Sequence, residues 1–380
     1  MRNNSIDGLR GQASLIVMIT HFTMAFTPGI LDMNYPMLFK RVAHPSFLQE
    51  VARFPLVSIF YNGNFAVLIF FVISGFVLSK PYYEGDIERI KRLIWGRYLR
   101  LNIPIAISVI ISFILFKTGL YKNLDAALLS GSVNWLSQIY PPIISSSDLV
   151  HIALYKTIFF GDFSLNPALW SLGIEFIGSI CLLLFCLCMP SSYKIFSILT
   201  IGVIFWIIYK EFSIYFIAML SGLFIHHLKI KSKHYLLIIF IFGIYFGLYQ
   251  GGRVYYDILP NLDGILATDP ITYTALGAFL LTLSVANGFG ANFFAQKFFI
   301  WLGSISYSLY LLHILILSTA GCWLYLSLQP GIYSLTLIFV IYILMSILTS
   351  YLYTLTVDRF SIKISHHFAN ILCGNLTRTL

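Results

Sequence analysis

An arginine and a histidine interrupt an apolar stretch near the start of the chain, DGLRGQASLIVMITH, which runs from Asp7 to His21. An α-helix turns by about 100° per residue, so Arg10 and His21 lie on one face, about 16 Å apart along the axis. Ionisable groups inside a membrane are costly and usually mark a functional site. The alternative, a signal peptide, is disfavoured because no small-residue cleavage site follows His21.

Two further ionisable side chains are expected at a similar membrane depth. His313 follows Trp301 by twelve residues, and Glu175 follows Trp170 by five residues. If both tryptophans lie at membrane interfaces, His21 and His313 are about 18 Å and Glu175 about 22 Å from the cytoplasmic edge. Such groups are usually tolerated as pairs, so we expect the three side chains to meet.

This trio suggests acid–base chemistry. A histidine can take the proton of a hydroxyl group that attacks a carbonyl carbon, while a carboxylate holds the other ring nitrogen. We interpret His21 as the base and Glu175 as the group that orients it. Two alternatives remain open: His21 as a nucleophile that forms an acyl-imidazole, and His21 as a hydrogen-bonded packing residue.

Three arginines, Arg10, Arg97 and Arg100, are expected together at the cytoplasmic edge. The planar fork of arginine suits phosphate recognition, although snorkelling and membrane anchoring explain the same positions.

On a later helix Ser306, Tyr310 and His313 share a face, at offsets of four and seven. They can donate to an oxyanion or line a substrate path, or they can serve as interhelical hydrogen bonds. The five cysteines show no zinc spacing, so we expect no metal.

The composition predicts an all-α, polytopic membrane protein. Of the 380 residues, 58% are hydrophobic and 10% are charged, where a soluble domain carries about 25% charged residues. Ten apolar segments are expected to span the lipid bilayer. They are approximately 9–28, 62–79, 98–116, 170–189, 195–209, 212–228, 235–250, 271–289, 300–321 and 334–356. The region 125–144, which ends in Pro141-Pro142, is expected to be an interfacial or re-entrant loop.

The distribution of charge predicts the orientation. With both termini in the cytoplasm, 16 of the 24 lysines and arginines lie on the cytoplasmic side. The net charge of +9 is therefore mainly a topology signal, and we expect no nucleic-acid partner. We predict one membrane domain over 1–360 and a short cytoplasmic tail over 361–380.

Five segments in order resemble the integral-membrane acyltransferase family 3. They are DGLRG with the histidine eleven residues after its arginine, FFVISGFVLS (70–79), RYLR (97–100), NPALWSLGIEF (166–176) and LGSISYSLYLLH (302–313). The resemblance extends from residue 6 to about 356. One departure is visible, because many members carry a second acid after the position of Glu175, where this chain has Phe176.

The resemblance implies transfer of an acyl group, often acetyl, to a hydroxyl of a cell-envelope polysaccharide, lipopolysaccharide or glycolipid. It also implies acyl-CoA as the donor, a co-substrate rather than a permanently bound cofactor, and the bacterial inner membrane as the location. The arginine and histidine implicated in the family map onto Arg10 and His21, and its Arg-x-x-Arg pair maps onto Arg97 and Arg100. These arginines would hold the phosphates of coenzyme A while its pantetheine arm reaches toward His21.

Two other classes of protein are alternatives to an acyltransferase. A transporter or flippase of a lipid-linked glycan would show inverted repeats and broken helices, which we do not detect. A glycan polymerase would be expected to carry arginines in a large periplasmic loop, whereas only Arg41, Arg53 and Arg253 lie on that side. The identity of the acceptor is left open.

Overall fold

The computed structural model describes residues 3–376 apart from positions 36, 41, 140–143, 189–211, 252, 261–268 and 330. Within these ranges the chain folds into helices joined by loops, with no strand, which agrees with the predicted all-α class. The expected fifth apolar segment, 195–209, and Pro141-Pro142 lie outside the described residues.

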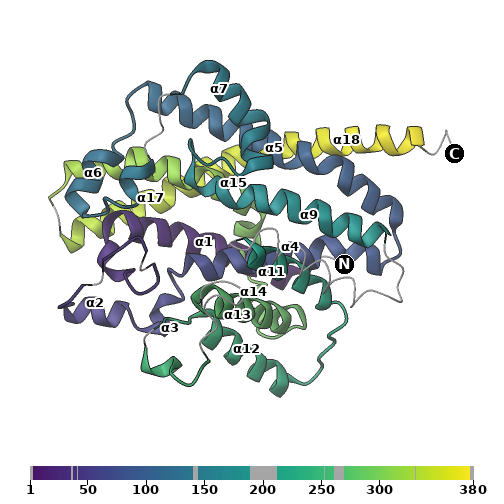
Figure 1. Ribbon diagram of the computed structural model, residues 1–380, viewed down its shortest axis with the longest axis horizontal. Coiled ribbons are helices and arrows are strands. Elements are labelled where there is room, and N and C mark those ends of the chain that lie inside the picture. Colours follow the sequence, from purple (N-terminus) through teal and green to yellow (C-terminus); the bar gives the residue numbers. More distant parts are fainter. Residues whose placement is uncertain are drawn as a thin grey trace.

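Most of the long helices run along the long axis of the molecule (Figure 1). They are α1 (Asn4–Phe26), α4 (Gly63–Tyr83), α5 (Ile87–Lys117), α9 (Trp170–Cys188), α15 (Lys297–Ile316) and α17 (Ile332–Tyr353). The start of α1 and the end of α18 (Arg359–Leu376) lie in the same half of this axis (Figure 1). The short helices at the opposite end are α2 (Phe47–Ala52), α3 (Pro55–Ser58) and α6 (Asn123–Ser130).

Nine of the ten expected spans fall on described residues, and these residues hold five helical stretches long and apolar enough to cross a membrane. They are Gly63–Tyr83, Ile87–Lys117, Pro167–Cys188, Lys297–Ser327 and Ile332–Gly374. Three expected spans form shorter helices: α11 (Ser213–Phe224), α12 (Lys233–Gly247) and α13 (Asp269–Ala286). A straight span needs about 20 residues, and α11 and α12 have only 12 and 15.

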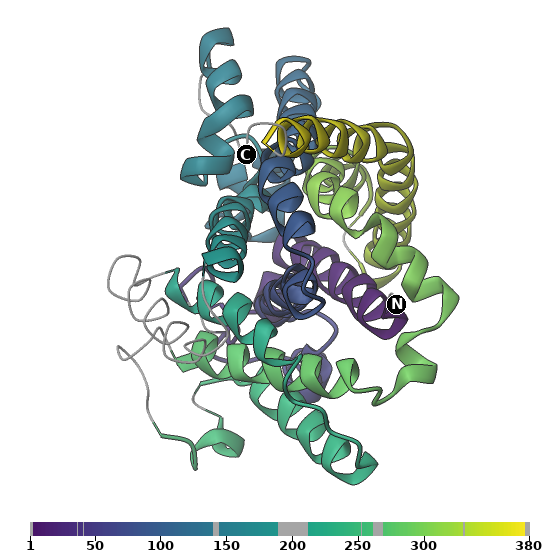
Figure 2. The same cartoon turned by 90° about the vertical axis from the view of Figure 1, so that its right-hand side faces the viewer.

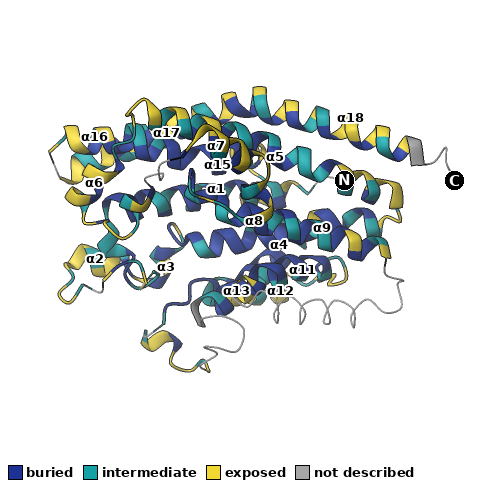
Figure 3. Cartoon of the chain, turned by 45° about the horizontal axis from the view of Figure 1, so that its top comes forward, coloured by how far each residue is buried: buried dark blue, intermediate teal, exposed yellow. Residues whose placement is uncertain are grey.

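Helix α1 is long and central, and it is less apolar than the five stretches. Its 23 residues include Asp7, Arg10 and His21, and it is not among the five apolar stretches. Most of its side chains are buried, as the dark blue ribbon in Figure 3 shows. Figure 2, turned by 90° from Figure 1, shows α1 and α4 between α18 on one side and the α12–α13 pair on the other. This central position explains why α1 tolerates polar residues, since protein rather than lipid surrounds them.

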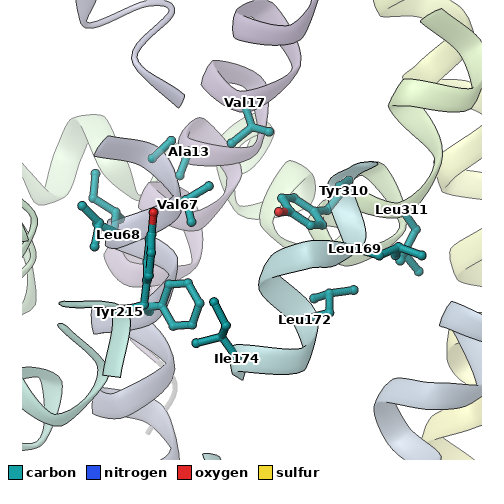
Figure 4. Close-up of a cluster of buried hydrophobic side chains, with 14 of the residues drawn as sticks. Ala13, Val17, Val67, Leu68, Leu169, Leu172, Ile174, Tyr215, Tyr310 and Leu311 are labelled. Atoms are coloured by element: carbon teal, nitrogen blue, oxygen red, sulfur yellow. The ribbon is translucent and has the colours of Figure 1, made fainter. Parts of the chain in front are cut away.

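The apolar core joins α1, α4, α9 and α15. Figure 4 shows the side chains that meet there: Ala13, Val17, Val67, Leu68, Leu172, Ile174, Tyr310 and Leu311. Glycines allow the closest approach between α4 and α11, because a Cβ atom at Gly75 would lie 1.7 Å from the carbonyl oxygen of Met219. Only glycine is compatible with backbones this close.

The segment expected to be a cytoplasmic tail is helix α18 over most of its length. It follows α17 through a wide helical turn, η8 (Thr354–Asp358), and packs along α5. Its buried residues Ser361, Ser365 and Ala369 recur at four-residue spacing, which places them on one face. Outside this face, Phe360, Phe368 and Ile371 are exposed.

Candidate active site

Glycines let α1 pack with its backbone against two neighbouring helices: Gly11 and Gly303 lie at the crossing of α1 and α15, and Gly8 lies against α14 (Ala291–Phe294). A Cβ atom would lie 1.7 Å from the Phe294 carbonyl oxygen at Gly8, 2.3 Å from that of Phe299 at Gly11, and 2.1 Å from that of Asp7 at Gly303. Two of these glycines belong to the DGLRG segment and the third to LGSIS. The close crossing places the polar face of α1 directly on the polar face of α15.

Arg10 is fixed at this crossing. Its Nε donates to Oγ of Ser306 and its Nη2 donates to the carbonyl oxygen of Gly303, both at 2.8 Å. Ser306 is itself buried and donates to the same carbonyl oxygen. The guanidinium is therefore held by one turn of α15.

His21 pairs with His313. Nδ1 of His21 lies 2.8 Å from Nε2 of His313, and Nδ1 of His313 lies 2.8 Å from the carbonyl oxygen of Leu309. The His313 side chain is buried, with 1% of the residue exposed. The expectation that ionisable groups of the two helices meet is confirmed for these two histidines.

The imidazole of His21 also stacks on an indole that the sequence did not single out. The ring centroids of His21 and Trp135 are 5.4 Å apart and the ring planes differ by 10°. Trp135 lies between α6 and the short helix η2 (Leu136–Ile139), within the region predicted to be an interfacial or re-entrant loop. This loop packs over the end of α1.

The predicted contact between Glu175 and His21 is wrong. Oε1 of Glu175 lies 2.5 Å from Nη2 of Arg97 and accepts from Oγ of Ser74 at 2.5 Å, while Nε of Arg97 donates to Ser179 at 2.7 Å. The reason is the position of α9, which carries Glu175 and packs against α4 and α5. A carboxylate removed from water pairs with the nearest cation, which here is Arg97.

Arg100 also has a carboxylate partner. Nη1 of Arg100 lies 2.6 Å from Oδ1 of Asp358, and its guanidinium carbon lies 5.2 Å from the centre of the Tyr307 ring. Asp358 is buried at the end of η8, so the wide turn between α17 and α18 carries it to α5. Both arginines of RYLR are thus held by ion pairs within the protein.

The three predicted arginines meet in one cavity of about 230 Å³. Arg10, Arg97, Arg100, Glu175 and Ser306 line it, together with apolar side chains of α4 and Tyr310. Its lining joins α1, α4, α5, α9 and α15, so it combines a cationic part with an apolar part. A cavity of this kind suits an anionic ligand with an extended apolar or amide arm.

Tyr310 connects this cavity to the histidine pair. Its hydroxyl lies 2.6 Å from Oγ of Ser171, and its ring centre lies 6.0 Å from that of His313. Ser306, Tyr310 and His313 each contact a neighbouring helix, as the interhelical interpretation predicts. Ser306 and Tyr310 line the cavity as well.

Comparison with known sequences decides the family. Residues 3–355 match the acyltransferase domain family. The chain belongs to this family. It is 30% identical over 140 residues to acyltransferase R4 of the fungus Phoma sp., a match that covers 31% of this chain and 30% of that protein. Acyltransferase clz18 of Cochliobolus lunatus is 26% identical over 141 residues, with the same coverage. The chain thus matches less than a third of the length of each relative. No solved structure matches it.

Membership of the acyltransferase domain family favours acyl transfer over the transporter and polymerase interpretations. At this site, sequence reasoning missed Trp135, Asp358, Ser74 and Ser171. Asp358 carried a signal, since it is an acid directly after the last apolar segment. Trp135 carried none, because nothing in its local pattern relates it to His21. Among the described residues no cluster of histidine, cysteine and acidic side chains suits a metal ion.

Proposed function

We propose that this acyltransferase moves an acyl group, such as acetyl, from acyl-CoA to a hydroxyl of a bacterial cell-envelope polysaccharide or glycolipid, with His21 as the general base. The observation that carries the proposal is the hydrogen-bonded chain from His21 through His313 to the Leu309 carbonyl group. A membrane protein of this family with a partly buried histidine and a cationic cavity fits a reaction between an anionic donor and an alcohol.

The hydrogen-bonded chain supports Nε2 as the basic ring nitrogen of His21. A carbonyl oxygen only accepts, so Nδ1 of His313 must carry the proton that it shares with Leu309. In a neutral His313 ring Nε2 is then an acceptor, so Nδ1 of His21 donates to it. Nε2 of a neutral His21 is left with a free lone pair, which is the form that a general base requires.

The reaction balances without a further reactant. Nε2 of His21 takes the hydroxyl proton while the hydroxyl oxygen attacks the thioester carbonyl carbon. The carbon–sulfur bond then breaks, and the thiolate of coenzyme A recovers the proton from His21. An ester and a thiol are formed, and the histidine pair returns to its starting tautomers. The Tyr310 hydroxyl is a candidate donor to the oxyanion.

The donor is assigned to the cavity with the arginines. Phosphate groups of coenzyme A would bind Arg10, Arg97 and Arg100 at the cytoplasmic side of the membrane. The pantetheine arm would follow the apolar wall toward Tyr310, the lining residue that adjoins the histidine pair. The acceptor would approach His21 from the side of the membrane where Trp135 lies.

The test combines two variants with a control. Membranes that contain the protein are given radiolabelled acetyl-CoA and envelope membranes from cells that lack it, and the label in glycans and glycolipids is counted. His21→Ala should lose about 10²- to 10⁴-fold in rate. His313→Ala should also lose activity, because it leaves the His21 tautomer unfixed. His367→Ala, at an exposed position on α18, is the matched control. Wild-type acylation by His21→Ala at equal expression would exclude the proposed base.

A further inference from the structure

Trp135 contacts the proposed base by a parallel stack rather than by an edge. The centroid distance of 5.4 Å and the interplanar angle of 10° describe two offset rings. His313, the other ring that contacts His21, has its centroid 4.9 Å away and supplies the hydrogen bond. The imidazole plane of His21 is therefore fixed by one hydrogen bond and one stack.

The loop that carries Trp135 is fastened to α1. Oγ of Ser132 donates to the carbonyl oxygen of Met24 at 2.6 Å, and Ser132 is fully buried. Nδ2 of Asn134 donates to the carbonyl oxygen of Leu38 at 3.1 Å, and Nδ2 of Asn123 donates to that of Leu136 at 3.0 Å. The indole is therefore held in place independently of His21.

Among the described residues, the side chains that contact the His21 ring include no carboxylate. Glu175 is bonded to Arg97, and Asp358 is bonded to Arg100. Neither His313 nor Trp135 is an anion. A base that becomes cationic during the reaction needs a group that favours the cation. An aromatic face within about 6 Å of a cation supplies such an attraction, and tryptophan supplies the strongest.

We propose that Trp135 is a positioning residue that holds the His21 ring and stabilises its protonated form through the indole face. The proposal rests on the proposed function, since it requires His21 to take a proton. The stack is a weak contact while His21 is neutral. It becomes a cation–π contact when the hydroxyl proton has moved to Nε2, so it acts in the transition state. Its loss should lower kcat and leave the KM for acetyl-CoA unchanged.

The test replaces Trp135 site-specifically by tryptophans that carry one to four fluorine atoms. Fluorine withdraws electron density from the indole face and changes its size little. The kcat for transfer from radiolabelled acetyl-CoA should fall stepwise with the number of fluorine atoms. Trp135→Leu, which has no aromatic face, should lose about 2- to 30-fold. Trp135→Phe should lie between the wild type and Trp135→Leu.

The same fluorinated series at Trp323, an exposed residue of α16 (Cys322–Ser327), is the matched control, and its kcat should not change with the number of fluorine atoms. If kcat does not change with the number of fluorine atoms at Trp135 while His21→Ala is still inactive, this inference is overturned and the proposed base is not. Activity in His21→Ala would instead overturn the proposed base, whatever the fluorinated proteins do. A fall that tracks fluorine number at Trp135 and not at Trp323 supports the cation–π role, because a purely structural contact would not follow electron density.

Discussion

A methyl group added at Gly11 should separate the two helices that carry the proposed base and its partner. The Cβ atom of Gly11→Ala would lie 2.3 Å from the Phe299 carbonyl oxygen and 2.7 Å from the Gly303 nitrogen. Both are backbone atoms, so no side-chain rotation relieves the overlap. Because real Cβ contacts are not shorter than 3.0 Å, α1 and α15 must move apart by about 0.7 Å.

This movement affects the site at two places. The bonds from Arg10 to Ser306 and from His21 to His313 are 2.8 Å long, and a shift of this size takes both to about 3.5 Å. A misplacement of about 1 Å can cost about 10²-fold in rate, so we expect kcat to fall by about 10- to 100-fold. Overpacking should also lower the free energy of unfolding by about 1–3 kcal/mol.

The assay is transfer of label from acetyl-CoA to envelope glycans, with thermal unfolding in detergent as the measure of folding. Gly251→Ala is the matched control, since nothing lies within 4 Å of a Cβ atom at Gly251. Gly11→Ala should remain folded at the assay temperature and lose activity, while Gly251→Ala should behave like the wild type. A wild-type rate in folded Gly11→Ala would refute the argument that the close crossing sets the geometry of the site.

Two further predictions concern the donor and the orientation. Arg97→Lys and Arg100→Lys keep the charge but lose the fork, so each should raise the KM for acetyl-CoA by about 5- to 150-fold, with kcat largely recovered at saturation. An unchanged donor dependence in both variants would remove coenzyme A from this cavity. In a cysteine-free background, Ile258→Cys should react with a membrane-impermeant thiol reagent in intact cells, and Lys231→Cys only after lysis; both positions are exposed. The reverse pattern would invert the proposed orientation.

The residues that share one face of a helix could be predicted from the sequence. Helical periodicity alone places Arg10 and His21 on one face of α1, because their angular relation depends only on the helix itself. The same argument places Ser306, Tyr310 and His313 on one face of α15. The three arginines were also expected together, and all three line one cavity, although Arg97 and Arg100 lie well inside α5 rather than at its start.

The partners across helices were decided by the tertiary structure. Depth along a helix predicted that Glu175, His313 and His21 lie at similar levels, but depth does not determine which way each side chain faces. The rotation and packing of α9 direct Glu175 toward Arg97, and the glycine crossing directs His21 toward His313. Trp135 reaches His21 only because its loop folds back over α1, and Asp358 reaches Arg100 only because the chain turns at η8. The hydropathy of a segment likewise shows that it is apolar, but helix length is decided by the fold. Nine of the ten expected segments fall on described residues, and five of these nine form helices long and apolar enough to cross a membrane.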